Sequence, residues 1–506
     1  MAKSEHNKSF RDHLSTIDEE GKRRWIFPKK PAGSYYKSRN IVAVILLIIF
    51  FSGPFIEING QPILLLNVLE RKFIIFGMAF WPQDLHLLLF GALAFIVFIV
   101  LFTSIFGRLF CGWACPQTIF MEMVFRRVEY WIEGDRMDQI RLNRSEWNWH
   151  KIWKKTTKHA VYFGMAFLIS NLFLAYVIGK DQLFDIITDP PSEHLAGLTA
   201  IVIFSGLFYG VFAFMREQVC HMVCPYGRMQ SVLLDNTSIN VMYDYKRGEP
   251  RAGMRERQKT KKKQKAQLKD IGFDASDDEL LVDKSQQTVT NFGDCIDCHQ
   301  CVKVCPMGID IRNGTQLECV HCTACIDACD DIMEKIGKPK GLIRYSSEDA
   351  IKKGRQKIIT PRVIGYSAVL LILLTTFFSL ILTRPATETT ILRQPGTLYQ
   401  ELPNEVYSNI FEIKAINKTF DNMNYRIELV SPEGEIATLG DFSALQPQAS
   451  TKGRFLLKLP KESLTGYQTE VRFDVYANGE KIETETANFL GPDDILQSKS
   501  QSQPKE

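Results

Sequence analysis

Cys295-Ile-Asp-Cys298-His-Gln-Cys301-Val-Lys-Val-Cys305-Pro306 is the stretch that sets the organisation of this chain of 506 residues. A second run repeats the spacing with Cys319, Cys322, Cys325 and Cys329. The other four of the twelve cysteines form two C-x3-C-P pairs, Cys111 with Cys115 and Cys220 with Cys224. Every cysteine therefore belongs to a spaced motif, and each C-x3-C-P pair lies at the end of a long apolar segment.

The eight-cysteine region has the spacing of bacterial two-cluster ferredoxins, in which the fourth thiolate of each run ligates the other cluster. Zinc sites and disulfides are the alternatives, but zinc sites use C-x2-C pairs with longer spacers or mixed histidine ligands. We therefore predict two [4Fe–4S] clusters and interpret His299 and His321 as loop residues. One cluster takes Cys295, Cys298, Cys301 and Cys329, and the other takes Cys319, Cys322, Cys325 and Cys305.

Five apolar segments are long enough to cross a bilayer, which requires about 20 helical residues. They are Asn40–Ile58, Leu85–Phe106, Ala160–Gly179, Leu195–Met215 and Val363–Thr383. About forty polar and charged residues precede the first segment, so we expect an uncleaved anchor rather than a signal peptide. Basic residues crowd 1–40 and 107–158, whereas the loop Asp181–His194 has four acids and no Lys or Arg. The positive-inside rule then predicts a bacterial inner-membrane protein with its N-terminus and eight-cysteine region in the cytoplasm.

These patterns divide the chain into seven parts. They are a cytoplasmic N-terminal segment at 1–39, a membrane domain at 40–245 with four transmembrane helices and both C-x3-C-P pairs, a basic linker at 246–284, a double 4Fe–4S domain at 285–345, a fifth transmembrane helix at 361–384, a periplasmic β-domain at 390–496 and a disordered tail at 497–506. By this topology every cysteine lies on the reducing side of the membrane, where thiolates persist.

The basic run from Lys246 to Lys265 holds ten Lys or Arg against two Glu. It lacks the interleaved aromatic residues of a single-stranded nucleic-acid surface. Because it follows a membrane segment, we expect it to contact anionic lipid headgroups and expect no nucleic-acid partner.

Beyond Arg384 apolar and polar residues alternate with a period of two, as in Phe411-Glu412-Ile413-Lys414-Ala415. Asn478-Gly479 is a strong hairpin signal. Short strands without cysteine predict an immunoglobulin-like β-sandwich. We find no catalytic constellation in it and expect it to serve in docking. The predicted fold class is thus a multi-domain membrane protein: an α-helical membrane domain, a ferredoxin-like α+β domain and a β-sandwich.

The C-x3-C-P pairs suit a soft metal. If the helix continues to the second cysteine, the i, i+4 spacing puts both sulfurs on one side, and the proline ends that helix or begins the next. Residues 117–133 are expected to form an amphipathic helix along the inner surface. Two facing dithiols would select Cu(I), zinc or an iron–sulfur species; inert packing and reversible disulfides are the other interpretations. The histidines lie at segment ends, so no haem is expected.

In this order the elements resemble the FixG/CcoG family, also called RdxA, of cbb3-type cytochrome c oxidase accessory proteins. The resemblance is carried by Cys111-x3-Cys115-Pro116, Cys220-His221-x2-Cys224-Pro225-Tyr226-Gly227-Arg228, the double run followed by Gly341-Leu342-Ile343-Arg344-Tyr345, the fifth helix and the β-domain. It implies a role in oxidase assembly, by reduction of Cu(II) to Cu(I) near the C-x3-C-P cysteines. It also implies oxidase subunits or copper chaperones as partners, and a cytoplasmic electron donor.

Two other functions fit the same motifs. A quinol dehydrogenase subunit resembling NapH and NosR would pass electrons from quinol through the clusters to an enzyme. A non-redox membrane scaffold would use the clusters to stabilise its fold or to sense iron and oxygen. Quinol-dependent cluster reduction would favour the first function, and redox-inert clusters would favour the second.

Overall fold

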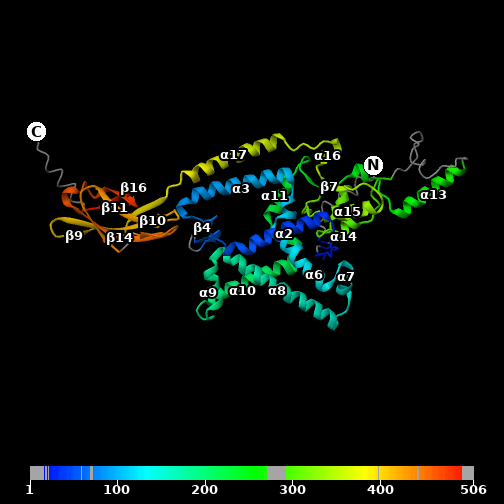
Figure 1. Ribbon diagram of the computed structural model, residues 1–506, viewed down its shortest axis with the longest axis horizontal. Helices are drawn as coiled ribbons and strands as arrows, with labels where there is room; N and C mark the ends of the chain where they lie inside the picture. Colours follow the sequence, from blue (N-terminus) through cyan, green and yellow to red (C-terminus); the bar gives the residue numbers. More distant parts are fainter. Residues whose placement is uncertain are drawn as a thin grey trace. The chain divides into compact units, whose positions relative to one another are not determined.

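The computed structural model describes residues 16–17, 20, 22–58, 60–68, 72–270, 292–396, 398–440 and 444–492. The predicted tail at 497–506, and parts of the predicted N-terminal segment and basic linker, lie outside the described residues. The chain divides into two compact units, one of Met1–Pro54 with Leu88–Thr376 and one of Phe55–Leu87 with Phe377–Glu506 (Figure 1).

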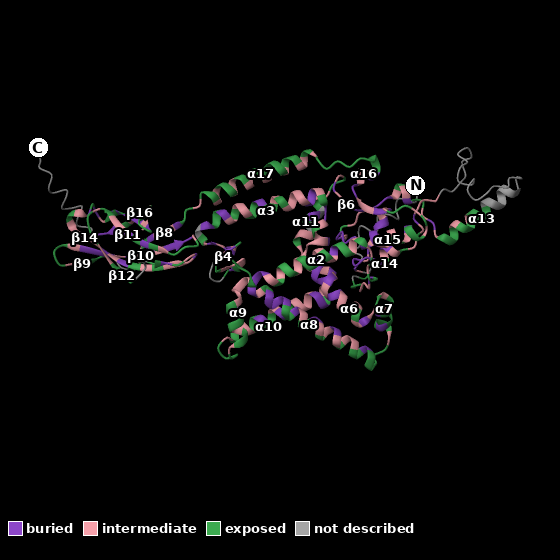
Figure 2. Ribbon diagram, viewed as in Figure 1, coloured by how far each residue is buried: buried purple, intermediate pink, exposed green. Residues whose placement is uncertain are grey.

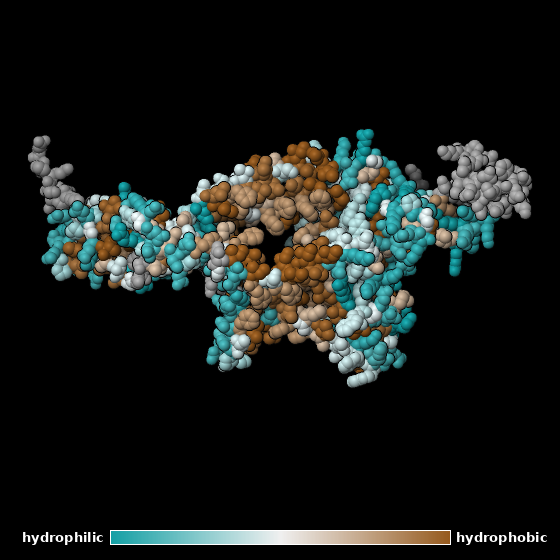
Figure 3. Space-filling view, viewed as in Figure 1, coloured by the Kyte–Doolittle hydropathy of each residue, from teal (hydrophilic) through white to brown (hydrophobic). Residues whose placement is uncertain are grey.

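Five helices have the length and composition to cross a membrane, as the sequence predicts. They are α2 (Ser34–Ser52, extended to Phe55), α3 (Leu85–Phe106), α8 (Trp149–Ile178), α10 (Leu195–Gly210, extended to Gln218) and α17 (Pro361–Leu382). Helix α8 begins at Trp149 rather than at Ala160, because the Asn148 side chain accepts a hydrogen bond of 2.8 Å from the Lys151 backbone N–H. On the face shown in Figure 3, brown hydrophobic side chains gather over the middle of the molecule, where the long helices of Figure 1 lie.

The two C-x3-C-P pairs adopt the same local design. Helix α4 (Leu109–Trp113) ends before Cys115, which is extended at φ −62° and ψ 125°, and Pro116 is the first residue of α5 (Pro116–Thr118). In the second pair, π-helix η6 (Val219–Val223) precedes an extended Cys224, and α11 (Pro225–Leu233) begins at the proline. The helix therefore does not continue to the second cysteine, and the proline begins the next helix in both pairs.

Residues 117–133 are helical, as predicted, but much of their charged face is buried in the protein, which the prediction of an amphipathic surface helix did not include. They contain the π-helix η3 (Ile119–Phe125) and helix α6 (Arg126–Glu133). Phe120 and Phe125 are buried as expected, but so are the charged side chains of Arg126 and Glu129. The charges point into the protein because they form ion pairs there.

The cysteine-rich part is a small α+β fold. Its elements are α14 (Gln300–Val304), η8 (Ile311–Asn313), α15 (Ala324–Lys335) and β7 (Ile343–Ser346). Strand β6 (Asn240–Tyr243) pairs antiparallel with β7, and Val241 and Tyr243 join its hydrophobic core. Residues 240–243, predicted to belong to the membrane domain, thus complete the sheet of this part.

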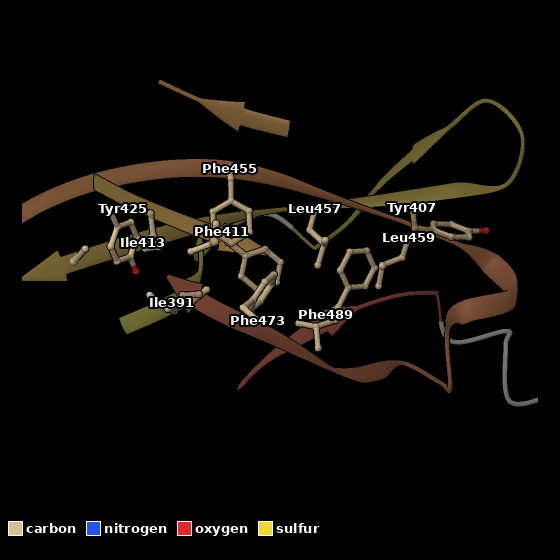
Figure 4. Close-up of a cluster of buried hydrophobic side chains, with 14 of the residues drawn as sticks. Ile391, Tyr407, Phe411, Ile413, Tyr425, Phe455, Leu457, Leu459, Phe473 and Phe489 are labelled. Carbon is tan, nitrogen blue, oxygen red and sulfur yellow. The ribbon is translucent and has the colours of Figure 1, made fainter. Parts of the chain in front are cut away.

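Residues 377–492 contain a β-sandwich of two sheets, with the strand orders β12-β14-β10-β8 (β9 also pairing with β10) and β13-β11-β15-β16. The strands are β8 (Thr387–Arg393), β9 (Gln400–Leu402), β10 (Val406–Asn417), β11 (Met423–Ser431), β12 (Glu435–Leu439), β13 (Ala444–Leu445), β14 (Ser450–Pro460), β15 (Gln468–Ala477) and β16 (Glu480–Leu490). Alternate residues are buried along them (Figure 2), and Phe411, Phe455 and Phe473 meet at the centre of the core (Figure 4). Asn478-Gly479 forms the turn that connects β15 to β16, with positive φ angles of 50° and 88°. The predicted hairpin and sandwich are confirmed.

Candidate iron–sulfur and metal sites

The eight cysteines of the double run separate into two groups around two cavities. Cys295, Cys298, Cys301 and Cys329 line the first cavity. Cys305, Cys319, Cys322 and Cys325 line the second, and Cys301 lies in the wall between the two. Cys329 lies on α15 with the second run, yet its nearest thiols are those of the first run, and Cys305 lies among the second. Each fourth cysteine therefore crosses to the other group, as the ferredoxin spacing predicts.

Both runs wrap their cavities with the same unusual backbone. The residues on either side of the second cysteine have left-handed φ angles: 51° at Asp297 and 56° at His299, then 54° at His321 and 62° at Thr323. The backbone of a non-glycine residue is strained in this region of φ and ψ. Four such residues at matching places therefore indicate a backbone conformation that is stabilised by a bound group.

The chemistry of the two cavities fits an iron–sulfur cluster. Apolar side chains such as Ile311 and Leu342 line much of the remaining walls, together with a few polar ones that include Arg312 and His321. Burial raises the pKa of Cys301 and of Cys319 to about 12, so near neutral pH these thiols keep their protons unless a metal ion displaces them. Backbone N–H groups of Met307 and Ile309 point at the sulfur of Cys305, which stabilises a thiolate ligand.

The two histidines of the runs are engaged in hydrogen bonds, in keeping with their interpretation as loop residues. His299 Nδ1 lies 2.8 Å from Arg312 Nη2, and His321 Nδ1 accepts from the Arg108 backbone N–H at 3.2 Å. Burial and the nearby charge of Arg108 lower the pKa of His321 to about 3, so its ring is neutral.

The structure brings the four remaining cysteines together. Burial raises the pKa of Cys111 to about 11, and Cys115 and Cys224 are close enough to add to this rise. Burial likewise raises the pKa of Cys220 to about 12, and the neighbouring thiols of Cys115, Cys111 and Cys224 add to this rise. Gln230 on α11 reaches back to the Cys111 sulfur, with its amide nitrogen at 3.3 Å. The four free thiols come from two distant segments and are neighbours, and we call them the four-thiol site. Among the described residues, no three of these sulfur atoms lie within 4.8 Å of one another.

Buried ion pairs tie the two halves of the four-thiol site to each other. Arg126, which follows the first cysteine pair, binds Glu217, which precedes the second pair. Glu129 binds Arg216 in the same way and also lies 3.5 Å from Lys158. Burial alone would raise the pKa of Glu129, but these cations more than offset it and hold that pKa below its usual range. Removing one partner of such a pair is strongly destabilising, because it leaves the other charge buried and uncompensated.

The four-thiol site lies directly against the second cysteine group. Cys111 packs on the hydrophobic cluster that contains Cys305 and Cys322. Gly112 has no room for a side chain, because a Cβ there would lie 2.5 Å from the His321 carbonyl oxygen. Arg39 spans the junction, donating to the Gly112 carbonyl at 2.9 Å and to the Cys322 carbonyl at 2.8 Å. The four-thiol site and the second group of cysteines are therefore in direct contact, so the path between them is short.

Sequence reasoning missed the residues that build this junction. Arg39 was visible as a charge at the edge of the first apolar segment, and Gly112 as the small residue inside a cysteine pair. Trp113 donates to the Tyr345 hydroxyl at 2.9 Å, but nothing in the sequence relates these two positions. The one usable signal in the sequence was a charged pair next to an apolar segment, such as Arg216-Glu217, which could have predicted buried ion pairs.

Three family models match the chain. A model described as a 4Fe-4S dicluster domain matches residues 215–282 and 269–348. A 4Fe-4S binding domain matches residues 88–135, which include Cys111 and Cys115. The IG-like fold at the C-terminus of FixG matches residues 377–492. These matches support iron–sulfur clusters and the β-sandwich.

Curated relatives extend over most of the chain. Protein RdxA of Cereibacter sphaeroides is 31% identical over 88% of this chain and 92% of its own length. Protein RdxB of the same organism is 32% identical over 82% of this chain and 84% of its own length. Nitrogen fixation protein FixG of Rhizobium meliloti is 36% identical over 64% of this chain and 58% of its own length. A membrane-bound electron-transfer role follows from these relatives together with the iron–sulfur models.

Proposed function

Because this chain belongs to the family of FixG and RdxA, we propose that it reduces Cu(II) to Cu(I) at the four-thiol site during assembly of a cbb3-type cytochrome c oxidase. The observation that carries the proposal is the packing of Cys111 against the cluster of Cys305 and Cys322. A soft four-sulfur site in contact with a one-electron relay is suited to an ion that accepts one electron.

Each residue group has a part in this reaction. [4Fe–4S] clusters, held by the two groups of four cysteines, supply electrons singly. Cu(II) gains one electron at the four-thiol site and becomes Cu(I), which thiolates prefer. Cys111 and Cys220 bind copper as thiolates, so copper binding releases their protons to water. Arg39 holds the Gly112 and Cys322 backbones together and keeps the path short.

We further propose the sidedness that the charges of the sequence predict. The N-terminal segment and both cysteine-rich regions face the cytoplasm, where thiols stay reduced. The β-sandwich faces the periplasm and docks oxidase subunits or copper chaperones. Labelling of the cysteines in intact cells and in inverted vesicles tests this arrangement.

The function is tested with anaerobically purified protein reduced by dithionite, freed of excess reductant and mixed with Cu(II) and a Cu(I)-specific chelator. We expect the wild type to form Cu(I). A Cys111→Ser, Cys220→Ser double variant should lose copper reduction yet keep its iron and sulfide. A Cys322→Ser variant should lose about half of its iron, since one cluster of two depends on this ligand.

The outcomes separate the proposal from its competitors. Unchanged copper reduction in both variants would show that copper gains its electron elsewhere. Loss of iron in the double variant would assign the four-thiol site to an iron–sulfur cluster instead of copper. Reduction of the clusters by a quinol, without copper reduction, would favour a quinol dehydrogenase subunit.

A further inference from the structure

A cavity of about 300 Å³ lies beside Cys305, outside the two cysteine-lined cavities and the four-thiol site. Three segments form its walls: residues 24–27 ahead of α2, helix α7 (Arg136–Arg144), and residues 302–308 around the end of α14. The volume is at the lower end of the range found for small-molecule sites.

Hydrogen bonds from two consecutive residues fix these walls. The Lys29 backbone N–H donates to the Lys303 carbonyl at 2.8 Å, which holds the N-terminal segment on α14. The Lys30 backbone N–H donates to Asp135 Oδ1 at 2.8 Å, immediately before α7. Ile26 covers Gly308 so closely that a Cβ there would lie 2.8 Å from its Cδ1 atom. The shape of the cavity is thus fixed by contacts within the folded protein.

The cavity is strongly cationic. Arg24, Arg136, Arg144 and Lys303 line it, and no Asp or Glu is among its described lining residues. Within the described part of the chain, none of these four side chains has a carboxylate at ion-pair distance, although Arg141 on the same helix lies 3.7 Å from Asp138. Four cations from three segments, without a carboxylate partner among the described residues, favour a multivalent anion, and Arg side chains match the geometry of phosphate.

The rest of the lining is apolar and partly aromatic. Trp25, Phe27, Ile140 and Val302 contribute it. A cationic rim with an apolar wall suits a ligand that carries a phosphate and a flat ring. The guanidinium groups of Arg23 and Arg216 already lie over the Trp25 ring, at 4.5 Å and 4.8 Å, so a flat ring would pack on the rest of this wall, which an inorganic phosphate would leave uncovered.

We propose that this cavity binds a flavin mononucleotide, with its phosphate among the four cations and its ring near Cys305, and that electrons enter the clusters there. The inference rests on the proposed function, which requires a cytoplasmic electron donor. A reduced flavin would lose one electron and release one proton to water, and the cluster held by Cys305 would gain that electron. A nicotinamide nucleotide fits less well because it transfers a hydride, whereas the clusters accept single electrons.

Equilibrium dialysis of the full-length holoprotein against flavin mononucleotide tests the site. We expect an Arg136→Gln, Arg144→Gln double variant to bind at least tenfold more weakly with unchanged iron content. The control is Arg141→Gln on the same helix, which should bind as the wild type does. Riboflavin, which lacks the phosphate, should bind as weakly to the wild type as the mononucleotide binds to the double variant.

Several results would overturn the inference. One is that flavin mononucleotide binds the wild type, the double variant and Arg141→Gln with equal affinity; another is that riboflavin binds the wild type as tightly as the mononucleotide does. A third is full displacement of the flavin by anionic lipid in nanodiscs but not by zwitterionic lipid, which would identify a lipid headgroup site. Binding only of an acidic electron-carrier protein would do the same. Copper reduction with dithionite does not depend on the cavity, so it separates the two proposals. If copper is reduced but flavin does not bind, only the flavin proposal is wrong. If flavin binds but copper is not reduced, only the proposed function is wrong.

Discussion

The eight cysteines of the double run and the four cysteines of the four-thiol site are positioned in different ways. Three of the four cysteines around each cavity lie within one short loop and the start of one helix, next to left-handed residues, and only the fourth cysteine comes from the other run. Cys115 and Cys220 are about a hundred residues apart in the chain and meet only because membrane helices and buried ion pairs bring their segments together.

This difference predicts how each region responds to change. A group fixed by local backbone should keep its ligand geometry when the membrane helices are perturbed. A group fixed by tertiary contacts should lose its geometry when one of those contacts is removed, even if every cysteine remains. Iron content reports on the first region, and the reactivity of Cys111 and Cys220 toward a maleimide reports on the second.

The largest effect is expected from Arg126→Met. The change leaves Glu217 buried without its main cation, and breaking a buried ion pair costs about 3–5 kcal/mol. We expect a lower Tm in detergent and faster maleimide labelling of Cys220, with little change in iron content. An Arg126→Met, Glu217→Leu double variant should recover part of the stability, since no buried charge of this pair is left alone.

An exposed ion pair of the cysteine-rich part provides the control. Lys335 and Asp331 lie 2.6 Å apart on α15, with more than half of each side chain exposed. Lys335→Met should change the stability by no more than about 0.5 kcal/mol. If Arg126→Met instead removed iron and left the labelling of Cys220 unchanged, the comparison between the two regions would be wrong.

A smaller loss is expected from Gly112→Ala at the junction of the two regions. The added Cβ would meet the backbone oxygen atoms of His321 at 2.5 Å and Val320 at 2.6 Å, and backbone cannot move aside as a flexible side chain can. We expect a cost of about 1–3 kcal/mol and slower electron transfer to copper, with both clusters present.

Gly164→Ala in α8 is the matched control, because its Cβ would meet no atom within 4 Å. It should leave stability and electron transfer as they are in the wild type. Equal rates of copper reduction for Gly112→Ala and Gly164→Ala would mean that electrons do not cross at Gly112.

A still smaller effect is expected from Asp327→Asn on α15. Its carboxylate accepts hydrogen bonds from the backbone N–H groups of Tyr35 at 3.1 Å and Tyr36 at 2.8 Å, at the start of α2. Asparagine keeps one oxygen acceptor but loses the charge, so we expect a cost of about 1 kcal/mol. Hydrogen exchange should increase in residues 34–38, whereas a loss of iron would show that this contact also supports the cluster ligands.

The same difference explains what the sequence could predict. The ligand groups of the double run follow from spacing because neighbouring residues determine local backbone, and the sandwich follows from the alternation around Phe411 and Phe473. The meeting of the two C-x3-C-P pairs was a hypothesis that only tertiary contacts could test. The burial of Arg126 and Glu129 was missed, since a charged residue on a helix is normally placed on its exposed face.

The smallest expected effect is the loss of stability at acidic pH. The cations around Glu129 hold its pKa below the usual range, so this carboxylate stabilises the fold at pH values above the unfolded-state pKa of about 4.5. That contribution is lost as pH falls through the lowered pKa of the folded protein. Between pH 7 and pH 4.5 the loss is only about 0.4 kcal/mol, since half of the unfolded chains bind a proton at this residue by then. We expect labelling of Cys220 to rise more steeply below pH 4.5 in the wild type than in Glu129→Gln, although the variant is less stable at pH 7. Parallel pH profiles would mean that other carboxylates hold the two halves of the four-thiol site together in acid.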